Sequence, residues 1–294
     1  MRLLTTTEAA EYLRLKERKI YELVAESAIP CTKITGKWLF PKDELDRWLA
    51  DSLQRPAGVS RQRPMPIIGG SHDPLLEWAL RESGSGLATL PEGSEAGLAR
   101  FMRGELTAVA IHLHAPASET VDANVEATRN ERSLYDAVLI AFARREQGFL
   151  IATGNPLGIA SLEDALQKRA RFALRPPGAG AQLLLQALLH RAKTSIERLK
   201  VVSPPCPTGP DIAQAIRAGR ADCGIATRSA ANAAGLDFVP IVWERFDLVV
   251  RQADYFRKPM QALLDFMRSP AMAARAQELR GYDLKDAGTV RSAP

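Results

Sequence analysis

Through most of its length the chain alternates short apolar stretches with amphipathic stretches of helical spacing. Residues 66–70, 86–91 and 106–114 have the length and composition of buried strands, and residues 73–84 and 92–105 between them space their apolar side chains as a helix does. Strands that alternate with helices are typical of a parallel sheet covered by helices on both faces. The pattern therefore predicts a doubly wound α/β fold for the large C-terminal part of the chain.

A second block of the same kind follows the first. Residues 137–152 suggest a hairpin, a strand at 171–175 runs into a glycine-bearing turn and a helix, and residues 211–226 suggest a helix and then a strand. Residues 235–251 suggest two strands, after which two helices close the chain. This order predicts two α/β lobes with the chain crossing between them. We expect the first lobe to comprise about 66–115 and 240–294, and the second about 116–239.

Composition restricts the class of protein. A chain of 294 residues suggests two or three domains, and contents of 25% charged and 46% hydrophobic residues are typical of a soluble globular protein. No apolar run approaches the roughly 18 residues that a membrane-spanning helix needs, and the start of the chain does not resemble a secretory signal. The three cysteines are scattered without a CxxC pair. We therefore expect a cytoplasmic protein with reduced thiols and no membrane partner.

The N-terminal stretch has a different organisation. Thr6 or Thr7 is suited to cap a first helix with an acidic first turn, and a second helix is expected from about Lys16 to Glu26. A proline then stops the helical structure, and the next residues alternate as two strands around a Thr35–Gly36 turn. Asp43 is suited to cap a third helix. This order predicts a winged helix-turn-helix, whose second helix can enter the major groove of DNA by its N-terminal residues.

The stretches TTTEAAEYLRLKERKIYELVAES and IPCTKITGKWLFPKDELDRWL resemble the excisionase/MerR-like DNA-binding module, over about residues 3–52. In that family the second helix reads the groove and the wing contacts backbone phosphate. The net charge of +5 is only mildly basic, so DNA binding has to be argued from where the charges lie, and a solvated helix face is the alternative. The resemblance implies that these residues face DNA: Lys16, Arg18, Lys19, Tyr21, Lys33, Thr35 and Lys37.

A proline- and arginine-rich linker without acidic side chains is expected at residues 54–65. Its arginines could follow a phosphate backbone, or could only keep the linker soluble. We therefore place the DNA-binding domain at residues 1–53 and a ligand-sensing domain at residues 66–294.

Further stretches resemble a type II periplasmic-binding-protein fold, and within it the cytoplasmic molybdate-binding type of domain: GGSHDPLLEWAL, GLATLPEGSEAGLARFMRGELTAVAIHL, RFALRPPGAGAQLLL, AIRAGRADCGIA and the C-terminal tail. This resemblance covers about residues 66–290. Together with the N-terminal match, it makes the chain similar to a one-component transcriptional regulator with a double-stranded DNA operator and a small-molecule effector. Because one winged helix buries little surface on DNA, we expect a homodimer or higher homo-oligomer on a palindromic site.

In folds of this kind the ligand lies between the lobes, beyond the carboxyl ends of the strands, where helix N-termini offer N–H groups to an anion. Ser71 and Ser94 could add hydroxyls there, Arg175 a charged guanidinium, and Asp222 could orient Arg175 or the hinge. The predicted ligand-binding residues at the three strand-to-helix junctions, with Asp222, are Ser71, His72, Asp73, Glu92, Ser94, Arg175, Gly178, Ala179, Gly180, Ala181 and Asp222.

Several of these residues have a purely structural alternative. Asp73 is also suited to cap the following helix, His72 to pack against the linker, and Glu92 to complement a helix dipole, whereas a Glu92 that faced the cleft would repel an anion. The glycines could serve turn geometry alone. The four histidines show no metal-ligand spacing, so we expect no metal.

One departure from the family pattern bears on the ligand. Ala179 and Ala181 stand where the family often has hydroxyl residues, and Gln182 where it often has a basic residue. We therefore expect either a molybdate- or tungstate-like oxyanion or a small organic ligand held against apolar walls, and no other cofactor. The nucleotide-binding and hydrolytic motifs are missing, which argues against an enzyme. The alternative is an excisionase-like architectural DNA-binding protein without ligand sensing, although DNA bending does not need a large α/β body.

Overall fold

The computed structural model describes residues 2–51, 64–114 and 122–293. They belong to two compact units, Met1–Pro56 and Ala57–Pro294. Residues 54–63 of the predicted linker lie outside the described part of the chain.

The first unit is a winged helix-turn-helix. At the turn of its hairpin, Thr35 and Gly36 both have positive φ angles, 48° and 82°, as the tight turns that suit hairpins require. Leu4, Ile20 and Phe40 lie in the core that joins the helices to a small sheet of order β1-β3-β2. The elements are β1 (Leu3–Thr5), α1 (Thr6–Leu13), α2 (Glu17–Ala25), β2 (Thr32–Ile34), β3 (Lys37–Pro41) and α3 (Lys42–Asp51).

Three details of this unit differ from the sequence prediction. Thr5 caps α1, in place of Thr6 or Thr7, because its hydroxyl accepts the Glu8 backbone N–H while the Glu8 carboxylate accepts the Thr5 backbone N–H. Asp43 lies inside the first turn of α3 and not at its cap. The unpredicted strand β1 pairs with β3.

The second unit is an α/β domain built on one sheet, whose described strands have the order β5-β4-β6-β11-β7-β10-β8-β9, with β12 and β13 also paired to β7. Its elements in chain order are β4 (Met65–Gly70), α4 (Pro74–Glu82), β5 (Ala88–Pro91), α5 (Ser94–Met102), β6 (Leu106–Ile111), α6 (Ala123–Arg129), η1 (Arg132–Leu134), β7 (Ala137–Ile151), α7 (Leu162–Gln167), β8 (Arg171–Ala173), α8 (Gly180–Arg191), η2 (Ile196–Arg198), β9 (Lys200–Val202), α9 (Gly209–Arg217), β10 (Cys223–Thr227), α10 (Arg228–Ala234), β11 (Asp237–Arg251), α11 (Gln252–Tyr255), α12 (Lys258–Met267), α13 (Pro270–Leu279), β12 (Tyr282–Asp283) and β13 (Val290–Ser292). None of the helices in the described residues has both the length and the apolar character needed to cross a membrane.

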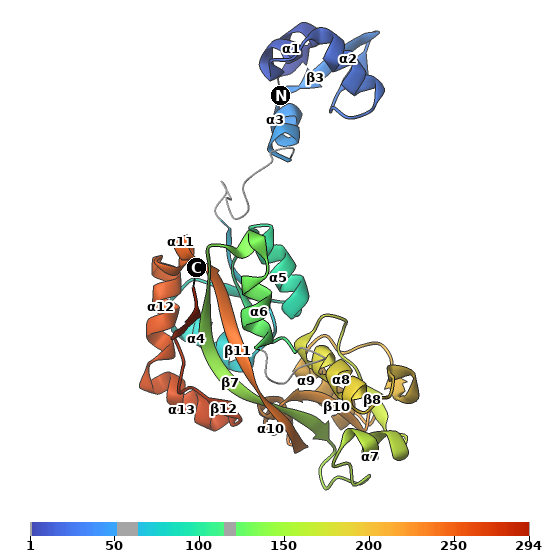
Figure 1. Cartoon of the computed structure of the whole chain (residues 1–294), viewed down its shortest axis with the longest axis vertical. Coiled ribbons are helices and arrows are strands. Elements are labelled where there is room, and N and C mark those ends of the chain that lie inside the picture. Colours follow the sequence, from blue (N-terminus) through green and yellow to red (C-terminus); the bar gives the residue numbers. More distant parts are fainter. Residues whose placement is uncertain (1, 52–63, 115–121, 294) are drawn as a thin grey trace. The chain divides into compact units, whose positions relative to one another are not determined.

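The two long strands β7 and β11 pair antiparallel along their length and run through both lobes (Figure 1). Parallel strands flank them on each side: β4, β5 and β6 in the first lobe, and β8, β9 and β10 in the second. The sheet is therefore continuous, and the lobes are its two ends.

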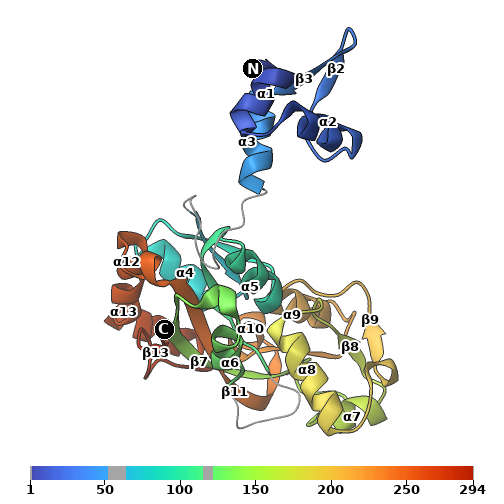
Figure 2. The same cartoon turned by 45° about the horizontal axis from the view of Figure 1, so that its top comes forward.

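Helices cover both faces of the sheet in each lobe (Figure 2). In the first lobe, Ile140 of β7 packs in a core with α4, α12 and α13, whereas its neighbour Leu139 packs in a core with α5. In the second lobe, Phe149 contributes to the core under α7 and α8, and Leu150 to the core under α9 and α10. Successive side chains of a strand point to opposite faces, so a strand covered on both sides is apolar throughout.

The hairpin predicted at residues 137–152 is wrong, because these residues form the single strand β7. The polar run at residues 144–147 looks like a turn in the sequence. In the structure it lies between Ala143, the last β7 residue in a first-lobe core, and Phe149, the first in a second-lobe core. Residues 237–251 likewise form one strand instead of two. The α6 segment and the first half of β7 pack in the first lobe, so the lobes part within β7 and not at residue 116.

Candidate functional site

The seven residues predicted to face DNA are all exposed. Ile20 is fully buried in the core of the first unit, while Arg18 on the same helix has a side chain that is 91% exposed. Glu22 accepts from both Arg18 Nε at 3.3 Å and Lys19 Nζ at 3.1 Å. Exposed pairs of this kind contribute little stability, so a DNA phosphate or base edge can displace them at small cost.

The wing presents a second basic surface. Lys33 on β2 lies opposite Trp38 on β3, and its Nζ is 5.1 Å from the centre of the indole ring. Lys37 follows the tight turn directly, and the hydroxyl of Thr35 donates to the carbonyl of Ile34. The ammonium group of Lys33 thus makes a cation–π contact with the indole, and Lys33 remains exposed.

A pocket lies between the two lobes of the second unit. Ser71 and His72 line it from the first lobe, Arg145 and Gln147 from the middle of β7, and Arg175 from the second lobe. The pocket is also lined by Pro74, His112, Gly209, Pro210, Ala226, Thr227, Ser229, Ala230, Ala233 and Leu279. Ser71, His72 and Arg175, which are far apart in the sequence, thus contribute to one cavity.

Arg145 is the centre of a buried polar network at the pocket floor. Its guanidinium, 1% exposed, donates to Glu244 Oε1 at 2.6 Å, to Asp73 Oδ2 at 2.9 Å and to His112 Nδ1 at 2.7 Å. Burial acts to lower the pKa of Arg145, but the carboxylates of Glu244 and Asp73 outweigh it and the pKa is raised. A buried charge is stable only when it is paired and hydrogen-bonded, as this one is.

Glu244 collects three donors: Arg145, Gln147 Nε2 at 3.0 Å and His114 Nε2 at 2.9 Å. Burial acts to raise its pKa, but the charge of Arg145 and the hydrogen bond from His114 act against burial, and the pKa of Glu244 is held below its ordinary range. Glu244 is therefore an ionised acceptor. In contrast, burial lowers the pKa of His112 well below its ordinary value, so its imidazole is neutral at physiological pH.

Arg175 reaches the pocket from the loop after β8. Its Nε donates to the carbonyl of Cys206 at 3.0 Å and its Nη2 to the carbonyl of Pro207 at 2.7 Å. Within the described residues no carboxylate makes an ion pair with it. Burial, together with the charge of Arg145, lowers the pKa of Arg175 to about 10. Arg175 therefore remains charged at neutral pH but lacks a counterion in direct contact.

Ser94 and the predicted glycine turn lie beside the pocket and do not line it. Ser94 connects segments of the first lobe, whereas the glycine turn contacts the first lobe from the second. Ser94 is fully buried; its hydroxyl lies 2.8 Å from the Ser71 hydroxyl and accepts the His112 backbone N–H. The carbonyl of Gly178 accepts the backbone N–H of Glu95 across the lobes. A Cβ on Gly180 would lie 2.1 Å from the His112 ring, so the N-terminus of α8, from Ala179 to Ala181, approaches the first lobe as closely as a glycine allows.

Asp73 has the structural role that the sequence left open. Its Oδ1 accepts the backbone N–H groups of Leu75 and Leu76 at the start of α4, and its Oδ2 accepts from Arg145 and from the hydroxyl of Tyr282. Tyr282 also lies 3.2 Å from the hydroxyl of Ser229 in the second lobe. Asp73 thus supports the pocket floor without lining the pocket.

Two predicted residues lie away from the pocket. Asp222 pairs with Arg171, through Nη2 at 2.6 Å and Nε at 3.1 Å, and not with Arg175. Asp222 precedes β10 whereas Arg175 follows the parallel strand β8, so the two lie at opposite edges of the sheet. Glu92 faces α5, where its Oε2 accepts from Arg100 Nη1 at 3.2 Å.

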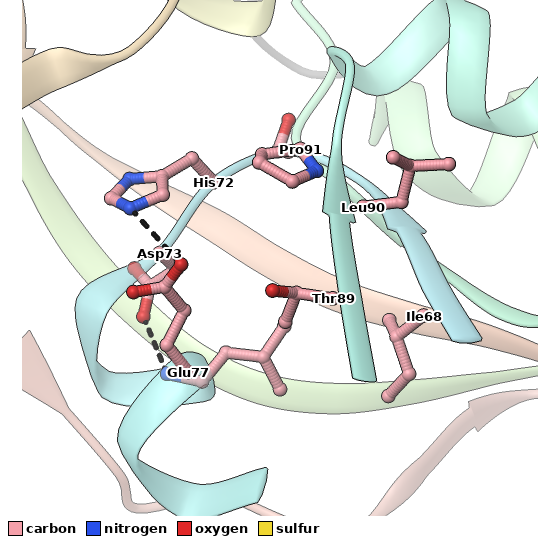
Figure 3. Close-up of a pocket in the computed structure, with 9 residues that line it drawn as sticks. Ile68, His72, Asp73, Glu77, Thr89, Leu90 and Pro91 are labelled. Carbon is pink, nitrogen blue, oxygen red and sulfur yellow. Dashed lines mark hydrogen bonds and ion pairs between the residues drawn. The ribbon is translucent and has the colours of Figure 1, made fainter. Parts of the chain in front are cut away.

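A smaller hollow lies between the start of α4 and the end of β5 (Figure 3). Thr89 and Pro91 line it opposite His72, whose ring is 3.6 Å from the carboxylate of Glu77. The imidazole of His72 therefore turns toward α4, and the main contribution of His72 to the network is its carbonyl, which accepts from Arg145.

Comparison with known families decides what kind of domain carries this pocket. The profile of the PBP superfamily domain matches residues 77–268. The chain belongs to the PBP superfamily. A helix-turn-helix domain profile matches residues 3–52, so the protein is a helix-turn-helix domain fused to a type II PBP-like domain. Both matching profiles describe binding domains, and neither is a catalytic family.

Relatives support the same architecture. The uncharacterized protein YvgK of Bacillus subtilis is 24% identical and aligns with 97% of this chain and 96% of its own length. Two solved structures share the fold of the PBP domain. A tungstate ABC transporter protein of Geobacter sulfurreducens has a TM-score of 0.52 at 15% identity, covering 72% of this chain and 97% of its own. The sulfate-binding protein SubI of Mycobacterium tuberculosis has a TM-score of 0.50 at 13% identity, covering 74% and 84%.

The polar network at the floor of the PBP-domain pocket contains five residues that were not predicted from the sequence: His112, Arg145, Gln147, Glu244 and Tyr282. A signal for part of it was present. Arg145 and Gln147 belong to a charged and polar run within an otherwise apolar segment, and Glu244 belongs to a similar run. Such a polar run, within a strand that is otherwise buried on both faces, indicates a place where the strand does not pack against a hydrophobic core.

Proposed function

We propose that the protein is a cytoplasmic, ligand-responsive transcriptional regulator that binds a small anion in the interlobe pocket and an operator through its winged helix. Residues 1–53 would bind DNA and residues 66–294 would sense the ligand. A homodimer on a palindromic operator would supply the surface that one winged helix lacks.

The observation that carries the ligand part of this proposal is Arg175. Its guanidinium lines the pocket, is held by two carbonyl oxygens, and has its pKa lowered to about 10 by burial and by Arg145. A charged side chain that is partly removed from water is stabilised by a partner of opposite charge, and an anionic ligand would provide one. Tungstate and sulfate in the names of the two similar structures are consistent with an anion.

The DNA part of the proposal is supported by the exposed basic residues of α2 and of the wing. Arg18 and Lys19 lie in the first half of the helix that enters the groove in helix-turn-helix domains, and Lys33 and Lys37 flank the wing turn. In this arrangement the helix reads bases and the wing contacts phosphates.

The test is a thermal-shift panel with molybdate, tungstate, sulfate, phosphate, acetate and glycolate on three proteins: wild type, Arg175→Met and Arg171→Met. A ligand at a hundredfold excess over Kd stabilises the folded state by about 2.7 kcal/mol. We expect at least one anion to raise the melting temperature of wild type and of Arg171→Met, but not of Arg175→Met. Arg171 is the matched control, because it lies at the other end of β8 and pairs with Asp222.

Two results would contradict the proposal. If no anion in the panel shifts the melting temperature of wild type, the pocket is not an anion site of this class. If Arg175→Met responds as wild type does, the anion binds elsewhere.

A further inference from the structure

Gln147 has only one allowed orientation of its amide group. The residue is 2% exposed and lines the pocket. One end of its amide lies 3.0 Å from Glu244 Oε1. Glu244 is an ionised carboxylate and can only accept, so the Gln147 atom beside it must be the NH₂ nitrogen. The carbonyl oxygen, Oε1, is then the other end of the amide, and among the described residues it has no hydrogen-bond partner.

His112 is fixed by similar reasoning. A guanidinium has no acceptor, so the contact of 2.7 Å between Arg145 Nη2 and His112 Nδ1 makes Nδ1 the acceptor. The neutral ring therefore carries its proton on Nε2. This N–H is buried, lies 3.9 Å from Glu244 Oε1, and has no hydrogen-bond partner among the described residues. Its ring edge packs against Gly180, the first residue of α8.

The pocket floor thus leaves one donor and one acceptor unused. A buried polar group without a partner costs free energy comparable to a lost hydrogen bond, and the great majority of such groups in proteins are satisfied. A fully deprotonated oxyanion offers only acceptors. It could satisfy His112 Nε2–H and Arg175, but it would place negative oxygen near Gln147 Oε1 and Glu244.

We infer that the ligand is a small anion that also carries an O–H or N–H group, which donates to Gln147 Oε1 while the anionic end faces Arg175 and His112. This inference rests on the proposed function and narrows its ligand class. The formal charges of the floor agree with it, because Asp73 and Glu244 provide two carboxylates against the single guanidinium of Arg145. A floor with an excess of acceptors favours a ligand with a donor on that side.

The test compares anions that differ in one donor. Phosphate near neutral pH carries at least one O–H, whereas sulfate, of similar size and shape, carries none; glycolate adds one hydroxyl to acetate. Calorimetry on the full chain should give a Kd about tenfold lower for the donor-bearing member of each pair, the scale of one buried unsatisfied polar group. In Gln147→Met, which keeps the length of the side chain but removes the acceptor, the preference within each pair should fall below about threefold.

The matched control is Gln261→Met, because Gln261 donates to the carbonyl of Tyr255 in the first lobe and does not line the pocket. Its preferences should equal those of wild type. Equal or reversed affinity within both pairs in wild type would overturn the inference while leaving an anion site, and so the proposed function, intact. Binding of none of the four anions would contradict both. If Gln147→Met does not fold, the wild-type comparison alone still decides.

Discussion

Individual side chains set the electrostatics of the pocket, and His112 offers a direct test of them. Glu244, Arg145, His114 and Arg175 surround it, and burial lowers the pKa of its imidazole well below the ordinary value. In the unfolded chain it titrates near 6.5. The unfolded state therefore binds more protons as the pH falls through 6.5, and the folded state loses stability there.

We expect the second unit to lose less stability in His112→Gln than in wild type when the pH falls from 7 to 5, by up to about 1.4 kcal/mol per pH unit. Urea unfolding at both pH values measures this difference. Burial raises the pKa of Asp247 to about 6, so Asp247 stabilises the fold as the pH falls. This contribution is the same in wild type and in His112→Gln, so it cancels in the difference between the two proteins. An equal loss in the two proteins would contradict a neutral His112.

Among the secondary-structure elements, α8 depends on Gly180. An added Cβ would lie 2.1 Å from the His112 ring and 2.3 Å from its carbonyl oxygen, so Gly180→Ala must push the start of α8 away from the first lobe. We expect the anion-induced thermal shift to be lost while circular dichroism stays as in wild type. Gly219→Ala is the control in the turn after α9, because Gly219 does not line the pocket and an added Cβ would have no neighbour within 4 Å among the described residues. An undiminished shift in Gly180→Ala would show that the close approach of α8 is not needed for binding.

The wing makes a separate prediction at the same scale. Lys33→Ala and Lys37→Ala should weaken binding to any mixed-sequence duplex, because phosphate contacts carry no sequence information. Each should reduce the slope of log K against log salt by about one unit, since one fewer counterion is released. Fluorescence anisotropy at several salt concentrations measures the slope, with Lys200→Ala in the second unit as control. Unchanged slopes in both wing variants would exclude the wing from the DNA interface.

The order of most helices and strands could be predicted from the sequence, because the spacing of apolar residues and the capping residues of helices are local features of the chain. The strand–helix units that carry Ser71, Ser94 and Arg175 lie where that pattern places them. The strand β7 could not be recognised from the sequence as one element. Its polar middle lies between the hydrophobic cores of the two lobes, and those cores are formed by segments far away in the sequence. The pairing of Arg145 with Glu244 could not be predicted for the same reason, because the two residues are brought together only by the register of β7 against β11.

For the whole molecule, the proposed function requires that ligand binding and DNA binding be coupled. Tyr282 links Asp73 in the first lobe to Ser229 in the second, and Gly178 is hydrogen-bonded to Glu95 across the lobes, so a ligand in the pocket would lie among the contacts that join the lobes. A ligand can shift DNA affinity only by its differential affinity for the two states, typically about 1–3 kcal/mol, or roughly 5- to 150-fold.

The most direct test of this account is the affinity of the full chain for a duplex enriched from a random library, measured by anisotropy with and without the anion that gives the largest thermal shift. For a ligand-responsive regulator we expect the Kd to change by at least about fivefold, in either direction, and we expect this change to disappear in Arg175→Met and to persist in Arg171→Met. A Kd that stays the same while the anion is bound would contradict it, and the protein would then hold its ligand without regulating DNA.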